Sequence, residues 1–404
     1  MMKKIWDTKG AKEDNSKTHQ AVENYTVGVD YLLDLELLPY DIQGTIAHAK
    51  MLHKIKILNS KELGILLNGL NKILELWKKG TFTIDKSQED SATAIEAYLT
   101  ENYGDVGKKV HTGRSRNDQC LTMTRLFSKE KLLEIQKETE SLVGALNAQI
   151  KKQGKIKMPG YTHMQRAMPS SVGMWLGSYH DGLQDDLILL DAVLKIIDQN
   201  PLGSAAGYGE NTLGLDRKFT TKELNFKRVQ ANPMYCGFSR GKFESIVLQS
   251  IGSVMFDIGK IASDLLLFTT KEFDFFALPD SFRTGSSIMP QKKNYDVLEL
   301  VRGNIAVFNG YRDQIENIIK NLPAGYNRDF QLTKEPFIKG INLALETLQI
   351  MILIVKNLEA KKENLENACT PELYATDDAL QLVKQGKSFR EAYQEIKEKF
   401  SRRN

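Results

Sequence analysis

Apolar residues recur at three- and four-residue spacing over much of this chain, which is the pattern of amphipathic helices. One such stripe consists of Leu63, Leu66, Leu67, Leu70, Ile73, Leu74 and Trp77. A second consists of Phe243, Ile246, Val247, Ile251, Met255 and Ile258, and a third of Val297, Leu300, Val301, Ile305 and Phe308. Alternating patterns typical of strands are nearly absent. The sequence therefore predicts an all-α fold whose stripes form the core.

Prolines and capping residues indicate where these helices begin and end. No proline occurs between Pro39 and Pro159, between Pro233 and Pro279, or between Pro290 and Pro323, so long helices fit these intervals. Helix starts are predicted at Thr220 with Glu223, at Thr370 before Pro371, and at Ser388 with Glu391, the last following a helix stop at Gly386.

The length of 404 residues is more than one small core requires, so we expect several domains. A Gly-containing region at His111 to Gly113 and a polar stretch from Lys361 to Thr370 supply the boundaries. We predict an N-terminal helical domain (1–112), a central bundle of long helices (113–362) and a short C-terminal helical domain (363–404).

Composition and charge restrict the environment and the partners. Hydrophobic residues make up 41% and charged residues 26% of the chain, without a long uninterrupted apolar segment, so no membrane span is expected. The formal charge of +4 comes from 55 basic and 51 acidic residues without a single-sign block, so nothing indicates nucleic-acid binding, while an anionic small molecule remains compatible. The polar start, Met1 to Gln20, and the few, widely spaced cysteines predict a cytoplasmic protein without disulfides.

Three polar segments containing glycine interrupt the helical pattern. They are HTGRSRND at 111–118, GYTHMQ at 160–165 and TGSSIMPQKKN at 284–294. In the third, Gly285-Ser286-Ser287 predicts a mobile turn, and Pro290 predicts the start of a helix whose free N–H groups favour an anion. A flexible loop with a solvated basic helix start is the alternative for a bare Gly-Ser-Ser, but the full run favours a ligand site.

A lyase that removes a proton beside a carboxylate needs such a segment, because negative charge develops on the carboxylate oxygens. Lys292 and Asn294 are the candidates for a fixed cation and a donor. His163 stands in a polar loop without core periodicity and could transfer protons near neutral pH, although a lone histidine is more often structural. Arg114 to Asn117 could bind a dicarboxylate through paired hydrogen bonds, with a surface basic patch as the competing interpretation.

Taken together, these segments resemble the argininosuccinate lyase branch of the fumarase/aspartase superfamily, from about Trp6 to about Phe400. GSSIMPQKKN carries the superfamily pattern in the form of this branch, and HTGRSRND and GYTHMQ agree with it. The run from Tyr326 to Gln331, continuing to Lys334-Glu335-Pro336, is also similar to that branch.

The resemblance implies a role for each matching position. Ser286 removes the proton from carbon and His163 protonates the departing guanidino nitrogen, with the assignment of acid and base within this pair left open. Glu299 matches a carboxylate placed against the histidine, Lys292 matches the cation that faces the developing charge, and Asn294 assists it. The implied substrate-binding residues are Thr26, Arg116, Asn117, Thr162, Tyr326, Gln331 and Lys334.

The resemblance also implies a three-domain helical fold with a central long-helix bundle, and elimination of arginine from argininosuccinate with release of fumarate. It implies a homotetramer in which each active site takes the three segments from three different subunits. No cofactor is expected, since the sequence contains neither a clustered Cys/His set nor a phosphate-binding glycine motif.

Several positions depart from the family pattern. Ala92 stands where many members have histidine, Tyr295 replaces the usual proline after Lys-Lys-Asn, and the chain ends earlier than is common. Two alternatives stay open: another fumarate-releasing lyase of the superfamily, and a catalytically silent structural tetramer of the crystallin type. Intact Ser286, His163 and Lys292 argue against the silent form.

Overall fold

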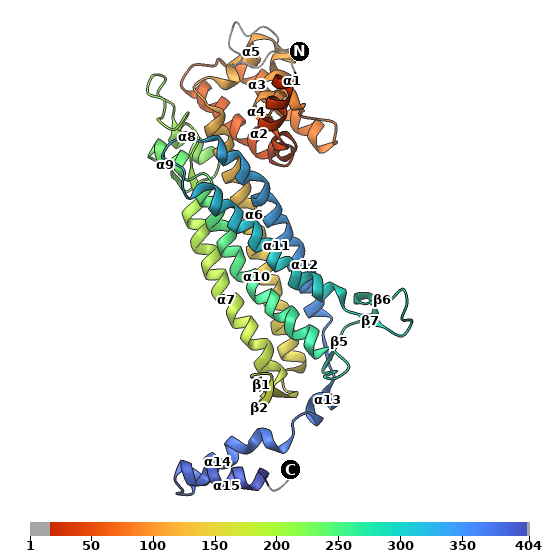
Figure 1. Ribbon diagram of the computed structural model, residues 1–404. Helices are drawn as coiled ribbons and strands as arrows, with labels where there is room; N and C mark the ends of the chain where they lie inside the picture. Colours follow the sequence, from red (N-terminus) through yellow and green to blue (C-terminus); the bar gives the residue numbers. More distant parts are fainter. Residues whose placement is uncertain (1–16, 402–404) are drawn as a thin grey trace. The chain divides into compact units, whose positions relative to one another are not determined.

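The computed structural model describes residues 17–401, and helices make up most of it (Figure 1). The expectation of a cytoplasmic protein rested partly on the polar stretch from Met1 to Gln20. The first 16 of these residues lie outside the described range. The chain falls into two compact units, unit 1 comprising 1–134, 190–250 and 309–342 and unit 2 comprising 135–189, 251–308 and 343–404. The predicted three-domain division is a different partition of the chain and stays a prediction.

Five long helices have residues in both units: α6 (Arg116–Gln153), α7 (Val172–Ile197), α10 (Lys242–Phe268), α11 (Asp296–Ile319) and α12 (Lys334–Lys356). The other elements of unit 1 are α1 (Lys17–Val27), α2 (Asp30–Lys54), α3 (Ser60–Lys78), η1 (Lys86–Gln88), α4 (Ser91–Tyr103), α5 (Asp105–Lys108), η2 (Lys109–His111), α8 (Arg217–Glu223), α9 (Pro233–Phe238) and η4 (Arg328–Thr333). A short parallel pair, β3 (Gln199–Asn200) and β4 (Arg228–Val229), completes the unit.

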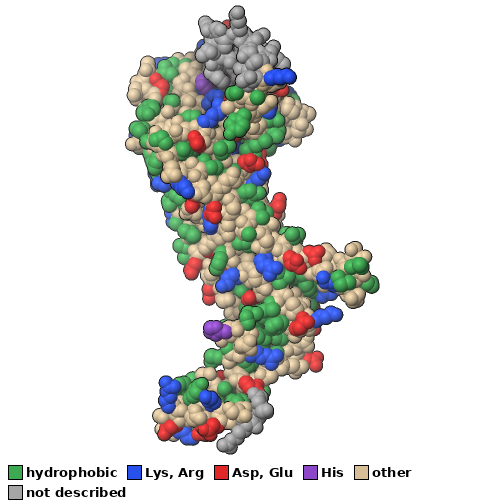
Figure 2. Space-filling view, in the orientation of Figure 1, with side chains coloured by type: hydrophobic (Ala, Val, Ile, Leu, Met, Phe, Trp, Pro, Cys, Tyr) green, Lys and Arg blue, Asp and Glu red, His purple; other side chains and the backbone are tan. Residues whose placement is uncertain are grey.

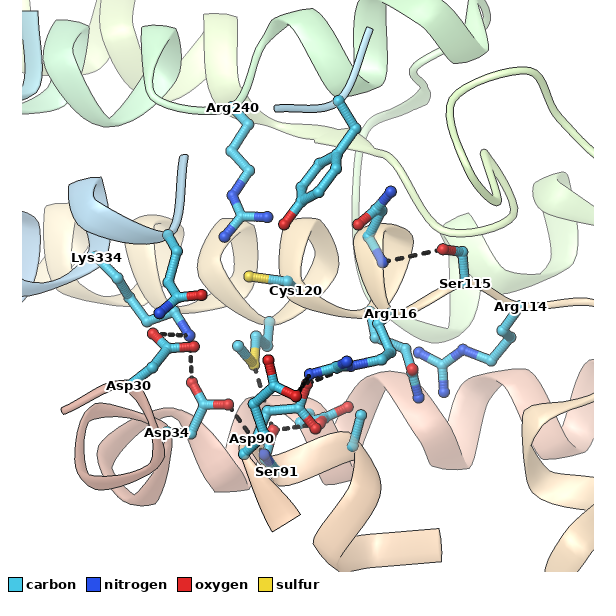
Figure 3. Close-up of a pocket in the computed structure, with 18 of the residues that line it drawn as sticks. Asp30, Asp34, Asp90, Ser91, Arg114, Ser115, Arg116, Cys120, Arg240 and Lys334 are labelled. Carbon is cyan, nitrogen blue, oxygen red and sulfur yellow. Dashed lines mark hydrogen bonds and ion pairs between the residues drawn. The ribbon is translucent and has the colours of Figure 1, made fainter. Parts of the chain in front are cut away.

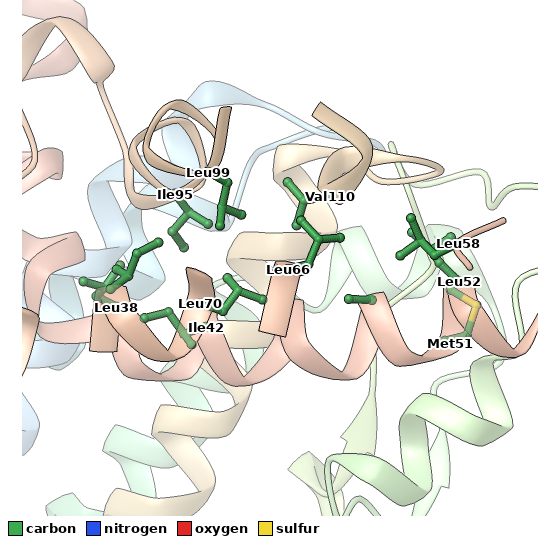
Figure 4. Packing of buried hydrophobic residues seen from close by; sticks show 12 residues of the cluster. Leu38, Ile42, Met51, Leu52, Leu58, Leu66, Leu70, Ile95, Leu99 and Val110 are labelled. Atoms are coloured by element: carbon green, nitrogen blue, oxygen red, sulfur yellow. The ribbon is translucent and has the colours of Figure 1, made fainter. Parts of the chain in front are cut away.

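The core of unit 1 forms where α2, α3 and α4 pack together (Figure 4). The first predicted stripe supplies its α3 side, with Leu66, Leu70 and Ile73 fully buried, so this prediction is confirmed. The helix begins where the sequence allows a capping box: Asn59 accepts from the Glu62 N–H at 3.0 Å, and Glu62 accepts from the Asn59 N–H at 3.0 Å.

Pro39 does not end a helix, contrary to the use of prolines as boundaries; it lies inside α2. Proline has no N–H, so the carbonyl of Leu35, four residues earlier, loses its helical donor. The indole N–H of Trp77 on α3 donates to that carbonyl at 2.7 Å. A residue from the predicted α3 stripe thus compensates for the proline and stabilises α2 at the same time.

Unit 2 contains three antiparallel strand pairs and the C-terminal helices. The pairs are β1 (Lys157–Thr162) with β2 (Gln165–Ser171), β5 (Phe276–Ala277) with β8 (Glu359–Ala360), and β6 (Thr284–Gly285) with β7 (Lys293–Asn294). The remaining elements are η3 (Asp280–Phe282), α13 (Lys362–Asn367), η5 (Pro371–Tyr374), α14 (Ala375–Lys384) and α15 (Phe389–Ser401).

The second apolar stripe is confirmed on α10, whereas the third needs a correction. On α11, Val301 and Phe308 are buried, but Leu300 is 66% exposed. Leu298 is fully buried instead, because positions 298, 301 and 308 share the face that packs inward. Leu300 was therefore wrongly assigned to the core.

Two predicted helix starts are confirmed and one is wrong. The hydroxyl of Ser388 accepts from the Glu391 N–H at 3.3 Å, after a left-handed Gly386 with φ of 100°, and η5 begins at Pro371. The prediction at Thr220 is wrong, since α8 begins at Arg217 and Asp216 caps it by accepting from the Phe219 N–H at 2.9 Å.

One helical stretch, Arg328–Lys356, is long and apolar enough by length and composition to cross a membrane. In its most apolar window 61% is buried inside the protein, as in the core helix of a helical bundle. Composition alone is therefore weak evidence for a span.

Candidate active site

A cavity of about 540 Å³ lies within unit 1 (Figure 3). Five of the seven predicted substrate-binding residues line it: Arg116, Asn117, Tyr326, Gln331 and Lys334. These residues come from α6, η4, α12 and the loop before η4. The structure thus brings together positions that are more than 200 residues apart in the sequence.

The first turns of three helices line this pocket, together with the point where η4 continues into α12. They contribute Asp30 of α2, Ser91 and Ala92 of α4, Arg116 and Asn117 of α6, and Lys334 of α12. The N-terminal end of a helix carries a partial positive charge and unsatisfied N–H groups. Three such ends contribute to a region that favours anions, although the α4 end already donates to Asp34 and Asp90.

Acidic and basic side chains balance in the pocket lining. Asp30, Asp34, Asp41, Glu89 and Asp90 are matched by Arg114, Arg116, Arg240, Arg328 and Lys334. Since the side-chain charges cancel, the helix ends leave the pocket with a positive potential. This electrostatic pattern suits a substrate with several carboxylates.

Lys334 is held between two carboxylates, as the dashed lines in Figure 3 show. Its ammonium nitrogen lies 2.8 Å from Asp30 and 2.5 Å from Asp34, and the side chain is buried. Burial lowers the pKa of Lys334, but Asp34 and Asp30 outweigh this effect and raise it above its usual range. Lys334 therefore carries a fixed positive charge at neutral pH.

Two arginines in the pocket share an acidic pair that precedes α4. The Nε of Arg116 donates to Asp90 at 2.5 Å, and a second nitrogen lies 3.6 Å from Glu89. Arg328 forms an ion pair with Glu89 at 2.5 Å. The carboxylates hold both guanidinium groups at the pocket wall, which restricts their rotamers before a ligand arrives.

Thr26 is not among the residues that line the pocket. Its hydroxyl donates to the Val22 carbonyl of its own helix at 2.9 Å, while its carbonyl accepts from the Gln331 amide at 3.0 Å. The contact of Thr26 with the predicted site therefore runs through its backbone.

Ala92, where the family resemblance led us to expect histidine, does line the pocket. A methyl group stands there in place of an imidazole, so position 92 offers no side-chain hydrogen bond. The neighbouring Ser91 hydroxyl donates to Asp41 at 2.6 Å.

His163 lies at the tip of the β1–β2 hairpin in unit 2, where a loop had been predicted. Thr162 pairs with Gln165, so His163 and Met164 form a two-residue turn, with φ of 50° and 60°. Positive φ at both central positions belongs to a turn that usually contains Asn-Gly, and each non-glycine residue there costs about 1–3 kcal/mol. The turn presents His163 and Met164 to solvent at the hairpin end.

Ser286 lies in the loop between β6 and β7. Its hydroxyl accepts from the Met289 N–H at 3.0 Å and from the Ile288 N–H at 3.3 Å. Lys292 is exposed, and its backbone N–H donates to the Met289 carbonyl at 3.0 Å. The segment is a turn-rich loop on a short two-stranded base.

The predicted helix start at Pro290 is wrong. Lys293 and Asn294 form strand β7, and α11 begins at Asp296. The hydroxyl of Tyr295 accepts from the Leu278 N–H at 3.1 Å and from Arg283 at 2.5 Å, which fixes the chain just before the helix. Lys292 could therefore stabilise an anion through its ammonium group, without the contribution of a helix end.

The predicted acid–base residues have no mutual contacts within the described chain. His163, Ser286, Lys292 and Glu299 form no hydrogen bond or ion pair with one another, and none of them lines the unit 1 pocket. Thr162 and Asn294 are also absent from its lining. In residues 17–401 no group of three or more His, Cys, Asp or Glu is placed to hold a metal ion.

Sequence reasoning missed several pocket residues, among them Asp34, Asp90, Arg240 and Arg328. Asp30 and Asp34 share one face at the start of a helix, and this i, i+4 spacing was a usable signal. No local pattern distinguishes Arg240, which stands alone before α10.

Comparison with known proteins agrees with the geometry. A family profile described as lyase matches residues 16–310. The chain is 42% identical over 402 residues to the argininosuccinate lyase of Thermotoga neapolitana, covering 100% of this chain and 99% of that protein. It is 41% identical over 390 residues to the argininosuccinate lyase of Xylella fastidiosa, covering 96% and 86%.

Solved structures show the same fold. EDDS lyase in complex with formate matches with a TM-score of 0.80 and 26% identity, covering 93% of this chain and 74% of that one. The class II fumarase of Schistosoma mansoni matches with a TM-score of 0.75 at 17% identity, covering 92% and 89%, which concerns the fold alone. The all-α, fumarase-like fold is thereby confirmed. On the strength of the profile and the full-length identity, this chain belongs to the argininosuccinate lyase family.

Proposed function

We propose that this chain cleaves argininosuccinate into arginine and fumarate by β-elimination, as a step of arginine biosynthesis. The observation that carries the proposal is the unit 1 pocket, which gathers Arg116, Asn117, Tyr326, Gln331 and Lys334 on its wall. Full-length identity of 42% to an argininosuccinate lyase supports the same substrate over other fumarate-releasing reactions.

The electrostatics of the pocket fit this substrate. Argininosuccinate carries three carboxylates, one on the arginine part and two on the succinyl part. Three helix N-termini and fixed cations such as Lys334 stabilise such groups without further rearrangement. A neutral or cationic substrate would gain nothing from this arrangement.

In the proposed reaction, Ser286 accepts a proton from the succinyl carbon next to a carboxylate. The electron pair of that C–H bond forms the double bond of fumarate, and the bond from the neighbouring carbon to the guanidino nitrogen breaks. His163 supplies the proton that this nitrogen takes up, while Lys292 and Asn294 stabilise the charge on the carboxylate. Glu299 orients His163, and the exchange of acid and base roles within the pair remains open to test.

We further propose a homotetramer in which each active site takes its three segments from three subunits. Large apolar side chains on the unit 2 parts of the long helices support this: Met174 and Ile188 are each 70% exposed, and Phe256 is 60% exposed. Some hydrophobic side chains are visible on the bundle surface in Figure 2. Exposed apolar faces of this kind mark interaction surfaces.

We place the protein in the cytoplasm and propose that it needs neither metal nor organic cofactor. The donors required for the mechanism, an acid–base pair, a cation and helix N–H groups, are all supplied by the chain. Thr26 and Thr162 stay in the proposed set of binding residues, with Thr162 next to His163.

The test is to purify the chain and follow fumarate formation from argininosuccinate by ultraviolet absorbance. We expect arginine and fumarate in equal amounts. Adenylosuccinate and EDDS serve as competing substrates, because a preference for either would favour another lyase of the superfamily. A folded tetramer that releases no fumarate from any of the three would support the silent structural alternative.

A further inference from the structure

Arg240 differs from Arg116, Arg328 and Lys334, the lining cations that form ion pairs within the described chain. It follows α9, two residues before α10 begins, and its side chain is only 8% exposed. It lines the pocket together with Cys120 and Tyr326. In Figure 3 its guanidinium extends toward the space in front of Cys120.

The other lining cations each have a polar partner on the protein. Lys334 pairs with Asp34, Arg328 pairs with Glu89, and Arg116 donates to Asp90. Arg114 donates to the Thr45 hydroxyl at 2.9 Å through one nitrogen, while its Nε and its other terminal nitrogen are buried without a hydrogen-bond partner.

The guanidinium of Arg240 forms no hydrogen bond and no ion pair with any residue that the structure describes. Its recorded contact is with the ring of Tyr326, 5.7 Å from the centroid. No dashed line reaches Arg240 in Figure 3. Burial lowers the pKa of Arg240, but Cys120, Tyr326, Glu244 and Asp30 outweigh this effect and raise it, although none of them forms an ion pair with it.

Burial of a guanidinium costs hydration, and for Arg240 the compensation comes from nearby groups that form no hydrogen bond with it, so its N–H donors have no partner among the described residues. Arginine is not neutralised in proteins, so loss of a proton does not relieve this cost. Its planar fork of donors matches a carboxylate with two parallel hydrogen bonds. A ligand carboxylate in the pocket would therefore be a suitable partner for the guanidinium of Arg240.

We propose that Arg240 binds a carboxylate of the substrate directly, with Tyr326 holding the guanidinium plane in place. This inference rests on the proposed function, since it assumes an anionic substrate in the unit 1 pocket. The carboxylate belongs either to the arginine part or to the succinyl part of the substrate. These cases can be distinguished because one carboxylate is retained in the product arginine and the others in the product fumarate.

The experiment compares Arg240→Gln and Arg240→Lys with Lys242→Gln. Lys242 lies two residues further along the chain and does not line the pocket, so its substitution removes the same charge from the same segment. KM and kcat are measured for argininosuccinate, and dissociation constants for arginine and fumarate are measured by calorimetry.

We expect Arg240→Gln to weaken binding of one product by about 30-fold or more, the scale for removing one side of a desolvated charge pair. The other product should change by less than about threefold, the Lys variant should retain part of the affinity, and Lys242→Gln should bind both products like the wild type. Loss of arginine binding assigns the contact to the arginine part, and loss of fumarate binding assigns it to the succinyl part.

Thermal unfolding separates this role from a structural one. Removing an unpaired buried charge should leave the melting temperature of the ligand-free protein unchanged or raise it, whereas loss of a structural arginine should lower it. Unchanged binding of both products, or a lowered melting temperature with both products weakened alike, would overturn the inference. A wild-type protein that releases no fumarate would refute the proposed function instead, and the calorimetric comparison would still decide the role of Arg240.

Discussion

Replacing Lys334 by methionine should destabilise the protein strongly as well as abolish substrate binding. The ammonium group lies 2.8 Å from Asp30 and 2.5 Å from Asp34, and Asp34 is only 1% exposed. Methionine preserves the volume of the side chain but leaves two neighbouring carboxylates without their cation. Asp34 retains one donor, the Ser91 N–H at 3.0 Å.

The expected loss is about 3–5 kcal/mol in the free energy of unfolding, the scale for breaking a buried ion pair from one side. The loss should depend on pH. Burial raises the pKa of Asp30, and Lys334 opposes that effect, so its removal raises this pKa further. A carboxyl whose pKa is higher in the folded than in the unfolded state gains stability as pH falls, so the deficit should shrink toward about pH 4.

Lys339→Met is the matched control on the same helix. Lys339 pairs with Glu335 at 2.6 Å, but the pair is exposed, and its loss should cost less than about 1 kcal/mol. Adding Asp30→Asn to Lys334→Met should restore part of the stability without restoring activity. The free energy of unfolding is measured by chemical unfolding at pH 8 and pH 5 for the wild type, the two single variants and the double variant. Equal stability of Lys334→Met and Lys339→Met at pH 8 would refute the energy assigned to the buried ion pair.

Further predictions concern catalysis, assembly and pH. Ser286→Ala and His163→Asn should each lower kcat by about two to four orders of magnitude without changing the fold or the proposed tetramer, and near-normal turnover would remove that residue from the mechanism. Refolding these two inactive variants together should restore about one quarter of the activity per site, because random assembly leaves some sites with both residues intact. Shared sites are contradicted if the mixture is no more active than either variant alone while mass measurement confirms that subunits have exchanged. Burial raises the pKa of Asp186 to about 6, with a hydrogen bond from Ser253 opposing the shift, so its charge opposes folding above that pH. The melting temperature of Asp186→Asn should therefore exceed that of the wild type at pH 8, and this difference should disappear between about pH 6 and pH 4. Asp185 is exposed, so Asp185→Asn should show no such trend. Equal melting temperatures of Asp186→Asn and the wild type at pH 8 would contradict the prediction.

The sequence predicted the elements whose signals are local and periodic. Leu66, Leu70 and Ile73 repeat at helical spacing, and they are buried because that spacing places them on one face. Five predicted binding residues meet in one pocket because the start of α6, which carries Arg116 and Asn117, lies near the segment from Tyr326 to Lys334. The assignment of Leu300 to the core was wrong because an apolar stripe spans about 100° of the helix surface. The sequence does not tell which edge of that stripe is buried by neighbouring helices.

Features that depend on tertiary contacts could not be predicted. His163 and Met164 form a turn normally made by asparagine and glycine, so no turn signal was present. Pro290 is a good first residue for a helix, but contacts of the Tyr295 hydroxyl with residues 278 and 283 delay the helix to Asp296. Arg240 becomes conspicuous only when the partners of the other pocket cations are known.

An anion-binding pocket must be stable before its ligand binds, and this requirement explains the balance of charges in the pocket. Several unpaired cations in one desolvated cavity would repel one another and destabilise the fold. Carboxylates such as Asp34 and Glu89 remove that repulsion and fix the positions of Lys334 and Arg328, at the cost of cancelling their net charge. The attraction for a polycarboxylate must then come from groups that need no counterion, and helix N-termini are such groups because their positive charge is a partial charge spread over backbone N–H donors. Arg240 has no ion-pair partner among the described residues, so by our proposal it is a position at which the pocket distinguishes one carboxylate of its ligand from the others.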